Sequence, residues 1–236
     1  MKPFGDKPPA DHEDIRNTRW DAKAEKFWVY QEGKEEFPPF FKTFLLKYQS
    51  TLGKKVLDIG LGTGQYAVPL AKRNFEVTGV EPSLGMRRGA ERNFKLADVE
   101  GKIRLLNEQS KNLSCFSDAN FDWIISIGAI HHNPWPDIEK SFAEAARVLK
   151  PGQLFVFHTR SVNDSKKIRE RIFNDNYGGY TALDSQGWKT KMVQHYFSEK
   201  GLRELGAKNG FQIVEGPKEE LGIDKGARWW VVYRKI

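Results

Sequence analysis

The chain has 236 residues, of which 39% are hydrophobic, 13% aromatic and 29% charged. This composition is typical of a globular protein and excludes a disordered one, and the length suits a single domain. Lysine and arginine number 38 against 31 aspartate and glutamate residues, which gives a formal net charge of +7. The basic residues are dispersed in small groups, so we expect most of them to face water.

No stretch reaches the roughly 18 apolar residues that a membrane-spanning helix needs, and residues 1–14 lack the apolar stretch of a signal peptide. The single cysteine, Cys115, has no second cysteine for an intrachain disulfide. We therefore predict a protein of the reducing cytoplasm. Residues 1–14 are expected to form a flexible tail, and residues 15–236 a single domain.

Two helices are expected near the N-terminus, within a helical cover of residues 15–50. Gly33 and the pair Pro38-Pro39 separate the two pieces. The segment is dense in aromatic side chains, which either pack against the rest of the fold or form a lid over a ligand. These aromatic residues are Trp20, Phe27, Trp28, Tyr30, Phe37, Phe40 and Phe41.

From Val56 onward, short apolar runs alternate with amphipathic stretches, which is the pattern of an α/β protein with a parallel sheet. The predicted strands span residues 56–59, 76–80, 103–106, 121–127, 153–158, 211–215 and 229–234. Helices are expected at residues 65–73, from the capping residue Ser83 to 97, around 138–149 and at 198–209. Residues 51–160 would form the ligand-binding core and residues 198–236 a closing helix and hairpin.

Residues 161–197 interrupt this pattern, and we interpret them as an insertion that shapes a substrate site. The insertion begins with a basic amphipathic piece, which we predict to be a helix. Its basic residues are Lys166, Lys167, Arg169 and Arg171.

A glycine-rich turn follows the first predicted strand. Asp58 ends the strand, glycines stand at positions 60, 62 and 64, and a helix comes next. Ligands of open α/β sheets bind in such crevices at the carboxyl ends of strands, and glycine allows close approach of a ligand. Glu81 ends the second strand, where a carboxylate can accept both hydroxyls of a ribose. The pattern predicts a ligand that contains adenosine.

A dinucleotide site is the main alternative for this turn. Its G-x-G-x-x-G pattern, counted from Gly60, requires glycine at position 65, where this chain has Gln65. Asp58, two residues before the first glycine, is unfavourable beside a pyrophosphate and suits the charged amine of a methionine moiety.

Residues 56–64, VLDIGLGTG, resemble the first motif of class I S-adenosylmethionine-dependent methyltransferases. Glu81-Pro82-Ser83 is similar to the second motif, residues 121–126 to the fourth strand and residues 146–152 to the turn before strand five. The resemblance covers residues 56–157. It implies a Rossmann-like, seven-stranded sheet of order 3-2-1-4-5-7-6, mostly parallel with the last strand antiparallel, and helices on both faces.

The resemblance also implies S-adenosylmethionine as the cofactor and assigns its contacts. Glu81 would hold the ribose and Pro82 would pack on the adenine. The family often has an aspartate after strand three, whereas here Gln109 is expected to accept the adenine amino group, or Glu108 after a register slip. The predicted cofactor-binding residues are Asp58, Gly60, Gly62, Gly64, Glu81, Pro82, Gln109, Ser110 and Ile127.

Methyl transfer is an in-line displacement that needs positioning and no covalent residue. His131 and His132 stand just past strand four, where either can act as a base or order the loop before Pro134; His131 is our catalytic candidate. No spacing among the histidines, carboxylates and Cys115 matches a metal site, so no required metal is predicted.

The acceptor is predicted to be a small molecule. The Asn/Asp-Pro-Pro-aromatic motif of nucleobase amino methylators is absent after strand four, and Cys115 lacks the Pro-Cys context of C5 enzymes. Ile130-His131-His132 resembles the small-molecule branch of the family. Two alternatives stay open: methylation of transfer RNA or another RNA, favoured by the +7 charge and the basic helix, and a non-catalytic cofactor-binding subunit.

Overall fold

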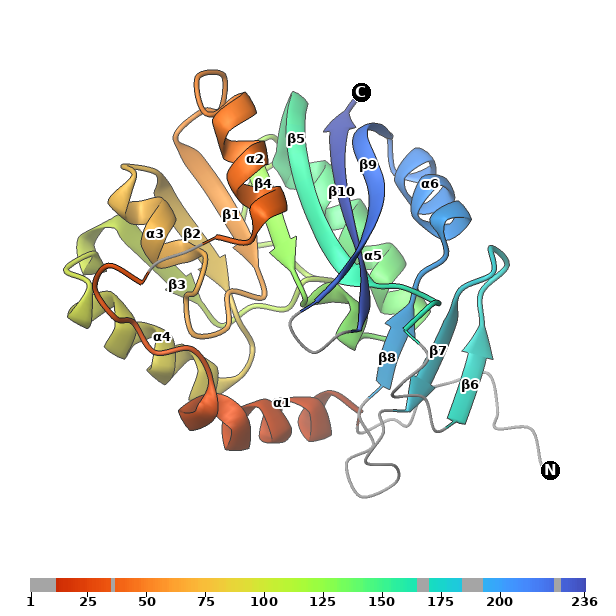
Figure 1. The fold of residues 1–236 in the computed structure, drawn as a ribbon, viewed down its shortest axis with the longest axis horizontal. Helices are drawn as coiled ribbons and strands as arrows, with labels where there is room; N and C mark the ends of the chain where they lie inside the picture. The colour runs from red at the N-terminus through yellow and green to blue at the C-terminus, as the bar shows by residue number, and fades with distance from the viewer. Residues whose placement is uncertain (1–11, 35–36, 165–169, 184–192, 223–225) are drawn as a thin grey trace.

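The computed structural model describes residues 12–34, 37–164, 170–183, 193–222 and 226–236. A seven-stranded sheet forms the centre of the molecule (Figure 1), in the order β3-β2-β1-β4-β5-β10-β9, with β10 antiparallel to both of its neighbours. Counting these strands alone, the order is 3-2-1-4-5-7-6, so the predicted fold is confirmed. The strands are β1 (Lys55–Ile59), β2 (Glu76–Val80), β3 (Ile103–Leu106), β4 (Phe121–Ile127), β5 (Leu149–Arg160), β9 (Phe211–Leu221) and β10 (Ala227–Lys235).

Helices cover both faces of the sheet, and each face has its own hydrophobic core. In β1, Val56 packs into one core, whereas Leu57 and Ile59 pack into the other. Because side chains alternate along a strand, central strands need apolar residues on both sides, which explains their continuous apolar runs. One face carries α2 (Pro39–Tyr48), α3 (Ala67–Lys72) and α4 (Leu84–Leu96), and the other carries α5 (Trp135–Val148) and α6 (Glu199–Lys208).

Local sequence signals fix the ends of two helices. The Oγ atom of Ser83 accepts a hydrogen bond from the backbone N–H of Met86 at 3.1 Å and so caps α4. Ser198 caps α6 in the same way. A capping hydroxyl stabilises a helix by about 1 kcal/mol. None of the described helices has the length and hydrophobicity that a membrane crossing requires.

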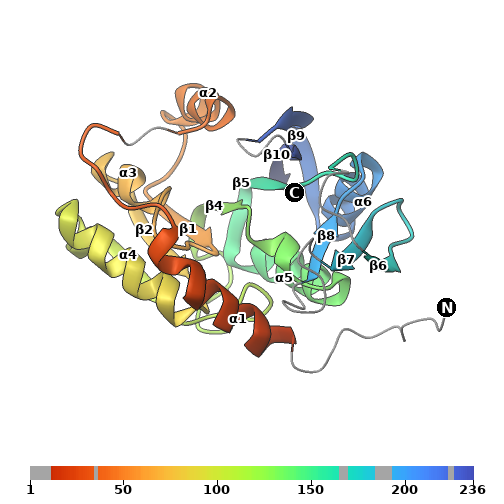
Figure 2. The same ribbon diagram turned by 60° about the horizontal axis from the view of Figure 1, so that its bottom comes forward.

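The N-terminal cover has two helices, as the sequence indicates. Helix α1 (His12–Lys23) begins within the predicted tail, of which residues 1–11 lie outside the described part of the chain. Figure 2 shows α1 beside α4. The Oδ1 atom of Asp21 accepts hydrogen bonds from the Ser83 hydroxyl at 2.6 Å and from the Gly85 N–H at 2.7 Å. A Cβ on Gly85 would lie 2.7 Å from the Asp21 Cα, so the helices approach closely at this glycine.

The insertion contains a small antiparallel sheet that the sequence did not lead us to expect. Its strands are β6 (Glu170–Asn174), β7 (Tyr180–Leu183) and β8 (Val193–Tyr196). The predicted basic helix is wrong at Arg171, which lies in β6; Lys166, Lys167 and Arg169 lie outside the described residues. The carboxylate of Asp175 accepts hydrogen bonds from the N–H groups of Tyr177 and Gly179, which fixes a tight turn after β6 and favours a hairpin.

Candidate active site

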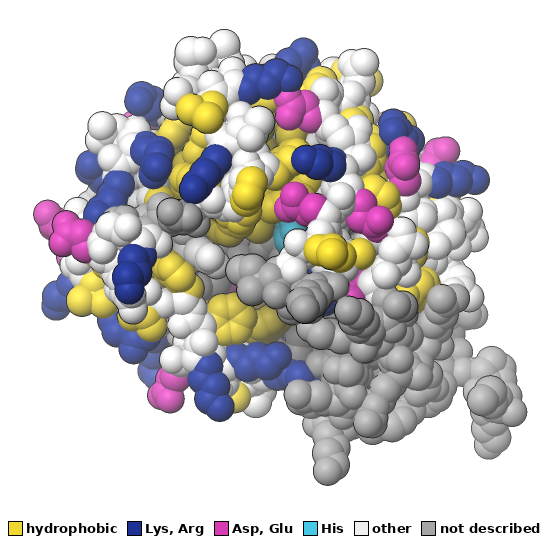
Figure 3. All heavy atoms as spheres, viewed as in Figure 1, with side chains coloured by type: hydrophobic (Ala, Val, Ile, Leu, Met, Phe, Trp, Pro, Cys, Tyr) yellow, Lys and Arg dark blue, Asp and Glu magenta, His cyan; other side chains and the backbone are white. Residues whose placement is uncertain are grey.

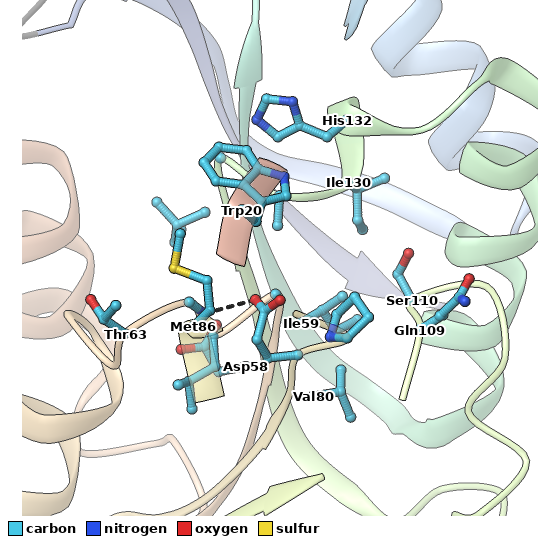
Figure 4. Close-up of a pocket in the computed structure, with 18 of the residues that line it drawn as sticks. Trp20, Asp58, Ile59, Thr63, Val80, Met86, Gln109, Ser110, Ile130 and His132 are labelled. Carbon is cyan, nitrogen blue, oxygen red and sulfur yellow. Dashed lines mark hydrogen bonds between the residues drawn. The ribbon is translucent and has the colours of Figure 1, made fainter. Parts of the chain in front are cut away.

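A pocket lies at the carboxyl ends of β1, β2 and β4, next to α1 (Figure 4). Four of the segments that line it stand at the ends of strands: the turn after β1, the end of β2, the residues after β3 and the residues after β4. Most of the predicted site residues line it, namely Asp58, Gly60, Gly62, Glu81, Pro82, Gln109, Ser110 and Ile127. Gly64 and His131 do not belong to the lining. Glu108 does, so both predicted partners for the adenine amino group stand at the pocket.

The glycines of the turn after β1 serve different purposes. Gly62 has a φ of +61°, and no atom lies within 4 Å of the position that a Cβ would take, so its open side faces the pocket. Gly64 has a φ of +91°, and a Cβ there would lie 2.8 Å from the Phe94 ring. Gly64 therefore allows α4 to pack against the turn, whereas Gly62 leaves room for a ligand.

Glu81 ties the ends of β1 and β2 together. Its Oε2 atom accepts a hydrogen bond from the N–H of Gly62 at 3.0 Å, and its Oε1 atom accepts one from the N–H of Ser83 at 2.9 Å. Burial raises the pKa of Glu81, while these two bonds oppose the rise. A carboxylate has about four lone-pair sites, so capacity for two ribose hydroxyls is left.

Asp58 is a buried carboxylate with 3% of its surface exposed. Burial, with a smaller contribution from the charge of Glu81, raises the pKa of Asp58 to about 8. No hydrogen bond from the described residues offsets this burial. A buried carboxylate in such surroundings favours a cation beside it, and the ammonium group of S-adenosylmethionine fits this requirement.

The far end of the pocket is held by Arg87, which sequence reasoning had not singled out. Its Nη1 atom donates hydrogen bonds of 2.8 Å to the carbonyl oxygens of Glu81 and Pro82 and to Oδ1 of Asn107. These bonds fix the end of β2 against the segment after β3. Pro82 and Gln109 therefore stand at defined places in the pocket lining.

The N-terminal segment contributes three lining residues, Arg16, Trp20 and Phe27. The indole of Trp20 meets the ring of His132 edge-on, with ring centroids 4.9 Å apart (Figure 4), and the side chain of Arg16 bonds to the amide oxygen of Asn133. The lid interpretation thus fits the location of Trp20 and Phe27. The packing interpretation fits the other aromatic residues of the cover, which lie in or against the core: Trp28, Tyr30, Phe37, Phe40 and Phe41.

The comparisons with known proteins agree with this geometry. A family model described as a methyltransferase domain matches residues 56–152. The chain is 28% identical over 128 residues to a probable S-adenosylmethionine-dependent methyltransferase of Saccharomyces cerevisiae. Residues 56–152 form a class I S-adenosylmethionine-dependent methyltransferase domain. The predicted family and its cofactor are confirmed for this domain.

The matched relatives differ in how much of this chain and of their own length the similarity covers. The yeast match covers 54% of this chain and 43% of the yeast protein, so the chain spans less than half of that relative. A match to an uncharacterized methyltransferase of Geobacillus sp., 26% identical, covers 78% of this chain and 82% of that protein.

A structural comparison supports the fold along the whole chain. The crystal structure of a Burkholderia thailandensis N1-methyltransferase with bound 1,6-didemethyltoxoflavin and S-adenosylhomocysteine superposes with a TM-score of 0.70 at 17% identity, and covers 99% of this chain and 93% of that one. At this level of identity the likeness establishes the fold.

The two histidines after β4 have different positions in the methyltransferase domain. Both are buried, and burial lowers the pKa of each well below its usual range, so both are neutral at pH 7. His132 lines the pocket, whereas His131 lies behind it, with the ring centroids 4.2 Å apart. His132 is therefore better placed than His131, our sequence-based candidate, to contact an acceptor.

A third histidine, His195, belongs to a buried network in the insertion. Its Nδ1 atom lies 2.9 Å from the Thr181 hydroxyl and its Nε2 atom 3.2 Å from Oδ2 of Asp175. The Trp135 ring packs on it at 4.7 Å, which joins the small sheet to α5. Thr181 is 2% exposed, so this arrangement holds the insertion in place and offers no nucleophile. Across the described residues, no three potential ligands gather as a metal ion requires, and the metal-free reaction stays a prediction.

Proposed function

We propose that this chain transfers a methyl group from S-adenosylmethionine to a small-molecule acceptor by in-line displacement. The observation that carries the proposal is the pocket itself, which has buried acids at the ends of β1 and β2 and an aromatic cover from α1. When bound, S-adenosylmethionine supplies an electrophilic methyl carbon on its sulfonium.

Different residues of the pocket bind different parts of the cofactor. Asp58 pairs with the ammonium of the methionine moiety, and Glu81 accepts the ribose hydroxyls. The open side of Gly62 leaves room for the ligand beside the turn. Pro82 packs on the adenine, and Gln109 accepts its amino group.

His132 takes the proton of the acceptor where the acceptor must lose one. Its imidazole is neutral because burial keeps its pKa low, so a nitrogen is available to accept a proton. Trp20 packs on His132 and closes this end of the pocket against water. Much of the rate enhancement is expected to come from holding acceptor and methyl group in line.

Several observations favour a small acceptor over RNA. Arg16, Trp20 and Phe27 reach into the pocket from the cover, which limits the space beside His132. The Burkholderia thailandensis protein of similar fold was crystallised with a small molecule, 1,6-didemethyltoxoflavin. The basic helix that favoured RNA is replaced at Arg171 by a strand. As part of the proposal we place the protein in the reducing cytoplasm, in line with the free thiol of Cys115.

The test is methyl incorporation from tritiated S-adenosylmethionine. The purified protein is incubated with the small-molecule fraction of a cell extract or with bulk transfer RNA at low salt. We expect label in the small-molecule fraction and none with Gly62→Val. Label in transfer RNA that falls steeply with salt would replace the proposal by the RNA alternative. S-adenosylhomocysteine binding without label in either sample would indicate a non-catalytic subunit.

A further inference from the structure

Two polar groups of the cofactor pocket have no hydrogen-bond partner among the described residues. They are the carboxylate of Asp58, at the end of β1, and the hydroxyl of Tyr66, at the N-terminus of α3. Asp58 is buried and Tyr66 is half-buried, so both groups meet little water. Polar groups in such surroundings normally have partners, so the two groups indicate a ligand that offers a donor to Asp58 and an acceptor to Tyr66.

The ring of Tyr66 is held by aromatic side chains of the N-terminal cover. It stacks on Phe37 with ring centroids 5.8 Å apart and meets Phe41 of α2 edge-on at 5.2 Å. Figure 3 shows the face of the molecule that carries α2, hollowed at its centre between hydrophobic side chains. Because this packing holds the ring in place, the hydroxyl is a positioned donor in the pocket lining.

The hydroxyl of Tyr66 keeps its proton. Burial raises the pKa of Tyr66, and the charges of Asp58 and Glu220 raise it further. The hydroxyl therefore donates a hydrogen bond and does not ionise at neutral pH. Since the interaction between charges weakens with distance, the action of Asp58 on this pKa also means that the two groups are close to each other in the pocket.

Backbone donors next to Asp58 in the turn are already engaged. The N–H groups of Gly60 and Leu61 donate to the end of β2, at 2.9 Å and 3.2 Å. The N–H of Gly62 donates to Glu81 at 3.0 Å. A ligand that needs a donor beside Asp58 therefore depends largely on side chains.

Few side chains of the lining can supply that donor. Arg16 is the only lysine or arginine among the described lining residues, and its charge is not among the causes that shift the pKa of Asp58. The hydroxyl of Thr63 donates to a backbone carbonyl at 2.9 Å. Gln65 is exposed, so water competes for its amide. Tyr66 is the remaining donor close to Asp58.

We propose that the hydroxyl of Tyr66 binds the carboxylate of the methionine moiety, so that Asp58 and Tyr66 together recognise the amino-acid end of the cofactor. The inference rests on the proposed function, since it deepens the cofactor site. The ammonium and the carboxylate of an amino acid are attached to one carbon atom. A ligand whose ammonium meets Asp58 therefore brings its carboxylate to a neighbouring donor. A hydrogen bond from a hydroxyl to a carboxylate is stronger than one between neutral groups.

The test is calorimetric titration with two probes. They are S-adenosylhomocysteine and its decarboxylated analogue, which keeps the ammonium and lacks the carboxylate. Tyr66→Phe should weaken S-adenosylhomocysteine binding by about tenfold and leave binding of the analogue unchanged, because the lost hydrogen bond had a charged acceptor. Asp58→Asn should weaken binding of both probes. The control Tyr48→Phe removes a hydroxyl that bonds to Glu215 outside the pocket, and should affect neither.

The outcomes separate this inference from the proposed function. If Tyr66→Phe binds S-adenosylhomocysteine as the wild-type protein does, or loses the same affinity for both probes, the hydroxyl does not bind the carboxylate. Selective loss of S-adenosylhomocysteine binding in Gln65→Ala, with none in Tyr66→Phe, also overturns the assignment. Tyr66→Phe keeps the ring that packs on Phe37 and Phe41, so the variant is expected to fold. Failure of S-adenosylhomocysteine to bind the wild-type protein would contradict the proposed function, and this inference with it.

Discussion

The proposed cofactor half and the proposed acceptor half of this site are built in different ways. Two of the residues proposed to bind the cofactor, Gly62 and Glu81, stand at the ends of two successive strands, and the hydrogen bond that joins them spans 19 positions. The proposed acceptor half draws together distant segments: Arg16 bonds to Asn133, 117 positions away, and the Trp20 ring packs on that of His132. A binding site made of consecutive turns leaves a pattern in the sequence, whereas a site made by tertiary packing does not.

The largest effect is expected in the cofactor half, at Gly62. Gly62→Val puts a branched side chain at a φ of +61°, in the space that faces the pocket. We expect S-adenosylhomocysteine affinity to fall by roughly 100-fold or more, because the variant combines backbone strain with a blocked site. Calorimetric titration measures this loss.

Gly152→Val is the matched control for Gly62→Val. Gly152 has a φ of +76° and open space at its Cβ position, but it lies outside the pocket. Both variants should lose stability, and only Gly62→Val should lose the ligand. If both variants lose the same affinity for S-adenosylhomocysteine, backbone strain explains the loss, and a blocked binding site at Gly62 does not.

The second prediction concerns Glu81. Glu81→Gln keeps the shape of the side chain and removes the charge that accepts the bonds from Gly62 and Ser83. Hydrogen bonds to charged groups contribute about 2 kcal/mol, so S-adenosylhomocysteine affinity should fall about 30-fold. Glu199→Gln, on the exposed side of α6, serves as control. Unchanged affinity in Glu81→Gln would remove Glu81 from the ribose site.

The third prediction is a pH dependence from Asp58. Its pKa of about 8 in the folded protein lies above the ordinary 3.8, so between these values the unfolded chain binds fewer protons than the folded one. The free energy of unfolding of the unliganded protein therefore falls as pH rises from 4 to 8, and Glu81 acts in the same direction. Urea unfolding at several pH values measures this dependence. The free energy of unfolding of Asp58→Asn should change less with pH than that of the wild-type protein.

Ligand affinity should show the opposite trend. The ammonium of S-adenosylhomocysteine pairs with the ionised form of Asp58, so affinity should rise about tenfold between pH 6.5 and pH 8. Asp58→Asn should bind weakly at both pH values. If the affinity of the wild-type protein for S-adenosylhomocysteine does not change between pH 6.5 and pH 8, Asp58 is already ionised without ligand.

The smallest effect is expected from the cover. Trp20→Ala removes ring contacts with His132 and Phe27, each worth about 1 kcal/mol. We expect a loss of S-adenosylhomocysteine affinity of about threefold and a larger loss of methyl transfer, because water then reaches the acceptor half. Leu46→Ala, an exposed residue of α2, is the control. Equal loss of affinity and transfer would limit Trp20 to cofactor binding.

The proposed cofactor half could be predicted from the sequence to a larger extent than the proposed acceptor half. The strand positions, the Ser83 cap and the residues around Gly62 and Glu81 follow from periodicity and short motifs, which local physics constrains, whereas the strand order follows from the resemblance to the methyltransferase family. Gly64 and His131 were predicted at the pocket, yet Gly64 packs on Phe94 and His131 stands behind His132. A motif gives the position of a residue along the chain, but not the direction in which its side chain points.

The residues of the acceptor half had no comparable signal. Arg16 and Asn133 are 117 positions apart, and only the packing of the N-terminal cover against the segment after β4 brings them together. The small sheet of the insertion was missed because its strands are short and the basic residues nearby favoured a helix. Aromatic density in residues 15–50 indicated either a lid or a core, and the structure places Trp20 at the pocket and Phe41 in the core.

The most direct test of the central claim, that the turn after β1 binds S-adenosylmethionine, is a pair of calorimetric titrations of the unchanged protein with S-adenosylhomocysteine and with NAD. Asp58 favours a cationic ligand, and Gln65 stands where a dinucleotide site has glycine. We predict saturable binding of one S-adenosylhomocysteine per chain and no binding of NAD. Binding of NAD without binding of S-adenosylhomocysteine would contradict the account.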